Sequence, residues 1–138
     1  GGVLFVQYNT NNSIGPVKAE MAPYPLNITR NRITDENATV NFLQPQHKVM
    51  NFPNVITQND FKDWVQERSI YHAEDLEGKY EKLFSIHDPG EKVNEGSLLV
   101  ANYGKGRFVY SGLVFFRELP AGVPGAFRLF ANLIATQR

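Results

Sequence analysis

Residues 96–135 read GSLLVANYGKGRFVYSGLVFFRELPAGVPGAFRLFANLIA, and this stretch decides the fold. It begins with two apolar segments, 97–103 and 107–116, in which strand-forming residues dominate. Between them stand Gly104 and Gly106, and glycine accepts the positive backbone angles that a tight turn requires. The pattern predicts a β-hairpin.

The hairpin is followed by a proline- and glycine-rich loop and an amphipathic segment. Residues 120–125, PAGVPG, break the strand ladder. The apolar stripe after them comprises Phe127, Phe130, Leu133 and Ile134, and the polar face comprises Arg128, Asn132 and Thr136. This spacing predicts a terminal α-helix that lies against the sheet.

The chain opens with an apolar run, Val-Leu-Phe-Val at residues 3–6, which is typical of a strand buried on both faces. Such a strand needs a neighbour on each side. We therefore expect residues 1–138 to form a single domain that is a C-terminal fragment of a longer chain, without the first βα units. Alternatively, a second copy covers the strand edge near residues 3–7 and forms a homodimer.

The middle of the chain reads as short strands separated by irregular excursions. Five prolines between residues 14 and 60 exclude a long helix there. Alternating residues predict strands over 26–33 and 80–87, and a short helical turn from Asn59 followed by a strand over 65–73. The whole pattern indicates an α/β domain with a mixed sheet.

Composition excludes several classes of function. Fourteen basic and fourteen acidic side chains cancel, so no net field attracts nucleic acid or an anionic membrane. No apolar run approaches the roughly 20 residues that span a bilayer. The absence of cysteine excludes disulfides, thiolate metal sites and a cysteine nucleophile. We expect no nucleic-acid partner, no membrane partner and no cofactor.

Several segments together resemble a known superfamily. The hairpin sequence GKGRFVYSGL, the helix GAFRLFANLIA, the element from Trp64 to Glu67 and the stretch QHKVM at 46–50 resemble the class I glutamine-amidotransferase-like superfamily, including ThuA-like domains. More closely, FFRELPAGVPGAFRLFANL, GGVLFVQYNTN and WVQERSIY resemble the domain that follows the catalytic region of bacterial LmbE/PIG-L-type deacetylases. The resemblance covers nearly the whole chain and implies a partial flavodoxin-like, amidotransferase-like sheet.

The same resemblance removes two activities. Working amidotransferases carry a cysteine after the strand that corresponds to residues 3–7, whereas this chain continues with Tyr8, Asn9 and Thr10. The zinc-binding His-Pro-Asp-Asp motif of the deacetylase catalytic region is also absent. We therefore expect no catalytic residue and no enzymatic activity in this chain by itself.

Two groups of residues are candidates for ligand binding. Tyr8, Asn9 and Asn11 lie in a polar loop after a buried strand, which is where open α/β sheets bind ligands. Trp64 and Glu67 belong to the segment that resembles ThuA-like domains, where an indole can stack on a sugar and a carboxylate can orient a hydroxyl. The alternative is a core tryptophan beside a surface pair of Glu67 and Arg68.

Arg117 and Arg128 flank the loop at 120–125, and the helix that follows has free N–H groups that can hold an anion. The alternative is that proline and glycine serve only the crossover from strand to helix. His72, His87 and Asp88 are weak metal-ligand candidates, because imidazole and carboxylate are metal-binding groups. The alternative for His87 and Asp88 is an Asp-Pro-Gly turn at a strand end.

The functional expectation is a non-catalytic accessory domain of an LmbE/PIG-L-type N-deacetylase, which serves packing, oligomerisation or substrate presentation. The resemblance implies a parent catalytic domain as partner. The sequence leaves the compartment open, and a bacterial periplasmic or secreted parent is one alternative. A carbohydrate-binding module, with a carbohydrate ligand, is the alternative. A ThuA-like hydrolase acting on sugar-related substrates, through Glu67 or His87, is a weaker one.

Overall fold

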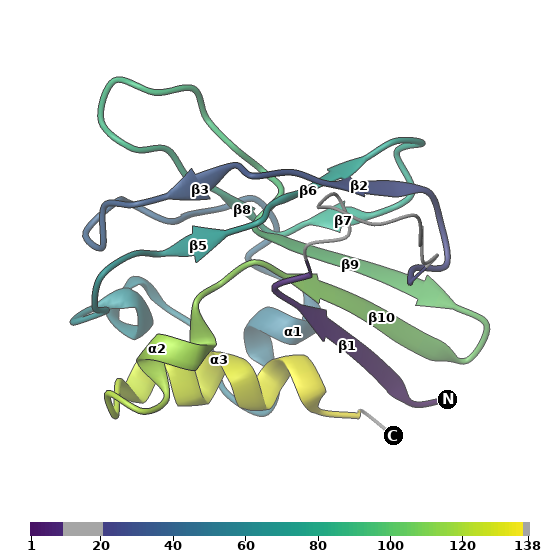
Figure 1. Cartoon of the computed structure of the whole chain (residues 1–138). Helices are drawn as coiled ribbons and strands as arrows, with labels where there is room; N and C mark the ends of the chain where they lie inside the picture. Colours follow the sequence, from purple (N-terminus) through teal and green to yellow (C-terminus); the bar gives the residue numbers. More distant parts are fainter. Residues whose placement is uncertain (10–20, 137–138) are drawn as a thin grey trace.

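The computed structural model describes residues 1–9 and 21–136. The C-terminal hairpin is formed by β9 (Leu98–Tyr103) and β10 (Gly106–Ser111), which pair antiparallel (Figure 1). Its turn has Gly104 at φ 56, in the left-handed region that favours glycine. The predicted hairpin is confirmed.

The second strand of the hairpin ends earlier than the sequence predicts. Beyond Ser111 the chain leaves the main sheet, because the Gly112 carbonyl accepts a hydrogen bond from the Ile70 amide at 2.8 Å. Phe116, predicted to lie in the strand, instead belongs to the short helix α2 (Phe115–Glu118).

The hairpin forms the centre of a four-stranded mixed sheet in the order β1-β10-β9-β7. Strand β1 (Val3–Gln7) pairs in parallel with β10, and β7 (Glu81–Lys82) pairs antiparallel with β9. The mixed α/β fold is thereby confirmed, while its description as amidotransferase-like and as a fragment of a longer chain stays a prediction.

Six short strands form three further two-stranded sheets. These pairs are β2 (Leu26–Ile28) with β6 (Ala73–Asp75), β3 (Arg32–Ile33) with β5 (Ser69–Ile70), and β4 (Asn41–Phe42) with β8 (Phe84–Ser85). The single strand predicted over 26–33 is broken because the Thr29 hydroxyl donates to the His72 carbonyl and accepts from the Asn31 amide. Such local bonds compete with a continuous ladder.

The helices are α1 (Lys48–Asn51), the 3₁₀ turn η1 (Gln58–Phe61), α2 and α3 (Pro124–Ile134). Helix α3 packs on the main sheet as predicted, but its buried face differs from the predicted one. Its buried residues are Gly125, Ala126, Leu129, Asn132 and Leu133, whereas Phe127 and Ile134 are about half exposed. The predicted polar residue Asn132 is buried because its amide donates to the carbonyls of Val49 and Asn54 at 2.8 and 2.7 Å.

The core lies on both faces of the main sheet. Val109 of β10 faces the larger cluster, which includes Leu129 and Leu133 of α3. Its neighbours Phe108 and Tyr110 face a smaller cluster on the other side. Within the described residues, no helix has the length and apolar character needed to cross a membrane.

Candidate functional site

Tyr8 lies at the carboxyl end of β1, with φ 52. Its hydroxyl accepts a hydrogen bond from the Phe116 amide at 3.2 Å, and its ring packs edge-on against the Phe116 ring at 4.8 Å. Burial holds the pKa of the Tyr8 phenol well above its ordinary value. The phenol therefore stays protonated at neutral pH and anchors β1 to α2.

Glu67 lies beside this anchor and is 3% exposed. One carboxylate oxygen accepts from Nη2 of Arg32 at 2.6 Å and the other from Nε of Arg117 at 3.1 Å. The Arg117 guanidinium also lies 4.8 Å from the centre of the Phe116 ring. The structure thus brings three predicted site residues, Tyr8, Glu67 and Arg117, to one place, with both Glu67 oxygens already bonded.

Sequence reasoning missed Glu118, which completes this group. Its side chain is fully buried, and one oxygen accepts from the Val65 amide at 2.5 Å. Burial raises the pKa of the Glu118 carboxyl, while the Val65 bond and the nearby Arg68 charge oppose that rise. The available signal was a carboxylate next to Arg117 within the apolar residues of FFREL. We call Tyr8, Arg32, Glu67, Arg117 and Glu118 the carboxyl-end cluster.

Arg68 is the neighbour of this cluster in the core. Its guanidinium donates to the carbonyls of Ala38 and Phe61 at 3.0 and 2.6 Å, and burial lowers its pKa. It lies 5.7 Å from the ring centres of both Phe61 and Trp64. The expected surface pair of Glu67 with Arg68 is therefore wrong, because Arg68 is buried and Glu67 bonds other arginines.

Trp64 is a core residue with 3% exposure. Its ring stacks on Phe61 at 5.3 Å, and its indole N–H donates to the Asp60 carbonyl at 2.9 Å. A sugar ring needs an open aromatic face. The structure covers that face, so Trp64 supports the core and offers no stacking platform.

The expected anion site at the loop 120–125 is not formed by the two arginines. Arg117 is bonded to Glu67, whereas Arg128 donates to Asp60 at 2.8 Å, to the Asn54 side chain at 3.1 Å and to the Val55 carbonyl at 3.0 Å. The first turn of α3 also lies against η1. A Cβ at Gly125 would stand 1.8 Å from the Asp60 carbonyl oxygen. The glycine is thus needed for close packing of the crossover.

The metal-ligand candidates do not form a metal-binding group in the described residues. His72 is 1% exposed, and its Nε2 lies 2.6 Å from the Ser69 hydroxyl. His87 is exposed, and its Nδ1 lies 2.9 Å from the Asp88 carbonyl. Across residues 1–9 and 21–136, no three His, Asp or Glu side chains stand where they can hold a metal ion.

Asp88 has a structural use. Its carboxylate accepts from the amide and hydroxyl of Thr34 and from the Asp35 amide, all at 2.8–2.9 Å. Burial works to raise the pKa of Asp88, but these hydrogen bonds outweigh burial and hold that pKa below its usual value. The Asp88 carbonyl accepts from the Glu91 amide at 3.0 Å, and Gly90 has φ 77. The alternative expectation of a turn is confirmed.

Of the two asparagine candidates in the loop, the structure describes Asn9. It follows Tyr8 directly and is half-buried. Asn11 and Thr10 lie outside the described residues. The ligand-binding role predicted for this loop stays a prediction.

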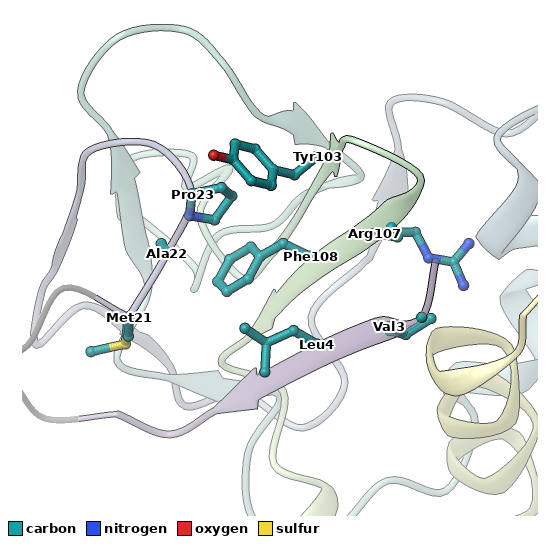
Figure 2. Close-up of a pocket in the computed structure, with 10 residues that line it drawn as sticks. Val3, Leu4, Met21, Ala22, Pro23, Tyr103, Arg107 and Phe108 are labelled. Atoms are coloured by element: carbon teal, nitrogen blue, oxygen red, sulfur yellow. The ribbon is translucent and has the colours of Figure 1, made fainter.

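A groove of about 650 Å³ lies between β1, the hairpin end and residues 21–23 (Figure 2). Its apolar lining includes Leu4, Met21, Ala22, Pro23, Tyr103 and Phe108. Leu4 is 57% exposed and Tyr103 is 63% exposed. The neighbouring Arg107 donates to the Ala135 carbonyl at the end of α3. We call this feature the β1 groove. The sequence predicts a strand buried on both faces at residues 3–6, and the exposed side chain of Leu4 in this groove contradicts that prediction.

The chemistry available to these groups is limited. The hydroxyl of Ser69 and the imidazole of His72 are within hydrogen-bond reach, as a nucleophile and its base would be. Both side chains are sealed in the core, at 0% and 1% exposure. In the carboxyl-end cluster, both oxygens of Glu67 are occupied by arginines. Both groups stabilise the fold, and neither presents an exposed reactive pair.

Comparison of the chain with family models, with curated proteins and with solved structures gives no match.

Proposed function

We propose that the chain is a non-catalytic accessory domain that accompanies an N-deacetylase of the LmbE/PIG-L type. The non-catalytic character is supported by the hydrogen bonds of Glu67, whose two oxygens accept from Arg32 and Arg117. A carboxylate fixed in this way is neither a free general base nor a free ligand for a sugar hydroxyl. The association with a deacetylase rests on the sequence resemblance of residues 115–133 and 64–71.

The non-catalytic role is tested by assaying the full chain against N-acetylated amino sugars and sugar esters, with and without added zinc. We expect no turnover above buffer. Turnover that is lost in Glu67→Gln or His87→Gln, but kept in the exposed control Lys62→Gln, would overturn the proposal and favour the hydrolase alternative.

The accessory role is tested with the catalytic region of an LmbE/PIG-L-type deacetylase that carries the His-Pro-Asp-Asp motif. Calorimetric titration of that region with the chain should show saturable binding. Deacetylation kinetics with and without the chain then separate packing from substrate presentation, since presentation lowers KM. Absence of binding at about 100 μM, well above the Kd of a stable complex, would refute the association.

A carbohydrate-binding module is a second candidate, and one observation favours it. Tyr103 is 63% exposed at the rim of the β1 groove, and its ring meets Tyr24 edge-on at 6.0 Å. An exposed aromatic at the rim of a hollow is a typical platform for a sugar ring. Titration with amino sugars and neutral oligosaccharides, followed by NMR, should then shift the Tyr103 resonances. Tyr103→Ala should abolish binding, while Trp64, buried in the core, should show no fluorescence change.

A further inference from the structure

The outer edge of β1 faces away from β10, and the described residues add no strand on that side. Its sequence, VLFVQ, contains no charged residue and no proline, the devices with which natural proteins usually blunt a sheet edge. Apolar side chains occupy both faces, with Phe5 towards α3 and Leu4 in the β1 groove. In the described part of the chain, β10 is the only strand that pairs with β1.

The hydrogen bonds of β1 show which backbone groups are free. The Gly2 carbonyl accepts from Arg107, and the Tyr8 amide donates to Ser111, so even-numbered residues point towards β10. Backbone groups alternate along a strand. The N–H and C=O groups of Val3, Phe5 and Gln7 therefore point to the open side.

Helix α3 adds an apolar flank beside the same edge. Phe130 packs against Phe5 of β1 with ring centres 5.6 Å apart, so this side of α3 faces β1. At 100° per residue, Phe127 and Ile134 lie about 60° and 40° beyond Phe130 around the helix, and at least about 100° from Arg128. They are 51% and 49% exposed. Figure 1 shows α3 running below β1 at this end of the molecule.

The other flank of α3 is already in use. Arg128 is bonded to Asp60, and Asn132 is bonded to Val49 and Asn54. The exposed flank thus contains apolar side chains alone, next to an open strand edge. Surfaces that combine these two features are sites of association.

We propose that a second copy of this chain pairs with this edge, β1 against β1 in antiparallel orientation about a twofold axis perpendicular to the sheet. The two four-stranded sheets then become continuous. Because the axis is perpendicular to the sheet, both α3 helices lie on the same face, where Phe127 and Ile134 of one copy meet those of the other. The two β1 grooves, each with its exposed Leu4, meet on the opposite face.

The surface favours a second copy of this chain over an unrelated partner, because it complements itself. Free N–H and C=O groups at Val3, Phe5 and Gln7 match the same groups on the copy, and an isologous contact closes at two subunits. The edge carries no charge that needs an opposite charge, and the fourteen basic and fourteen acidic residues leave no net repulsion between copies. This inference is independent of the proposed function, since a dimer can form whether or not the chain binds a deacetylase.

The test is sedimentation velocity on the full chain from about 1 to 200 μM, across the range of ordinary dimer affinities. We expect a species of twice 15.6 kDa. Phe127→Lys should raise the dimer Kd at least about tenfold, as expected for an apolar anchor at an interface. Val93→Lys and Leu76→Lys are matched controls, because these residues are 56% and 58% exposed elsewhere, and they should leave the Kd unchanged.

Amide hydrogen exchange provides an independent readout of the strand edge. The Phe5 and Gln7 amides should be protected at high protein concentration in the wild type and exchange rapidly in Phe127→Lys. Val3→Pro removes one amide from the open side, spares the bonds to β10, and should also weaken the dimer. A monomer at 200 μM, open-ended growth beyond two subunits, or a dimer insensitive to both substitutions would overturn the proposal.

Discussion

The carboxyl-end cluster and the outer edge of β1 are both next to strand β1. They differ in charge, in hydrogen bonding and in exposure to solvent. In the cluster, charged groups are numerous and bonded to one another, as Glu67 is to Arg32 and Arg117. Strand β1 itself contains no charged residue, and its outward backbone groups have no partner among the described residues. The side chains of Leu4, Phe127 and Ile134 are exposed to solvent. The charged residues of the cluster stabilise the fold, whereas the apolar residues at the edge are available for binding.

This contrast follows from the cost of burial. A carboxylate taken out of water is costly unless it is bonded, and arginines supply partners for both oxygens of Glu67. Glu118 has a partner for one oxygen only, and burial raises its pKa. An exposed apolar side chain or strand edge carries no such obligation and keeps its capacity for association. The exposed apolar area next to unpaired backbone is therefore the feature on which we base the proposed association.

The largest expected effect comes from the aromatic support of the cluster. Trp64→Ala should lower the free energy of unfolding by about 3–5 kcal/mol, the usual range for removing a buried tryptophan. It removes the stacking on Phe61, the bond to Asp60 and the contact with Arg68. Urea denaturation followed by circular dichroism measures the loss.

Tyr103→Ala, on the open side of the molecule, is the matched aromatic control. Its ring is 63% exposed, so the loss should stay below about 1 kcal/mol. Equal losses for the two variants would contradict the division into a bonded and an open region.

Local features of the sequence predict the fold near the hairpin well. The turn at Gly104 and the turn at Asp88-Pro89-Gly90 depend on the backbone preferences of a few adjacent residues, and both occur as predicted. The existence of α3 follows from its own sequence as well. Its orientation does not, because Asn132 is turned inward by carbonyls of Val49 and Asn54, which lie far away in the chain.

The same limit explains the site. Glu67 was a reasonable candidate by residue type, but its partners Arg32 and Arg117 are 35 and 50 positions away. A carboxylate in a sequence does not reveal whether arginines will neutralise it. Trp64 shows the converse, since aromatic residues serve cores and ligand sites alike and only the packing distinguishes the two uses.

A smaller effect is expected from pH, through His72. Burial lowers the pKa of its imidazole to about 4, compared with about 6.5 in the unfolded chain. Between these values the unfolded state binds more protons, so stability is full above pH 6.5 and declines as the pH falls towards 4. Linkage gives a loss of about 2 kcal/mol between pH 7 and pH 5. Urea unfolding at both pH values measures it.

His87, which is exposed, provides the control for this titration. His87→Gln should keep the decline between pH 7 and 5, whereas His72→Gln should flatten it. If His72→Gln does not fold, the NMR titration of His72 in the wild type decides, because its ring signals should stay constant down to about pH 5. A midpoint near 6.5 would disprove the burial effect.

The smallest effects on stability are expected from one substitution in each region, Glu67→Gln in the cluster and Leu4→Lys at the edge. Glu67→Gln keeps the shape of the side chain but replaces one acceptor oxygen with an NH₂ that confronts an arginine donor. Arg32 and Arg117 are half and one-third exposed, so water replaces part of the lost bonding and the cost should be about 1 kcal/mol.

Leu4→Lys, measured below the dimer Kd, should change stability by less than about 0.5 kcal/mol, because the residue is 57% exposed. Above the dimer Kd, Leu4→Lys should become the more destabilising of the two substitutions. The lysine at the edge removes the stability that pairing adds, whereas Glu67→Gln leaves pairing intact. A wild type whose stability does not rise with protein concentration, or a Leu4→Lys variant that gains as much stability as the wild type, would show that the β1 edge does not pair.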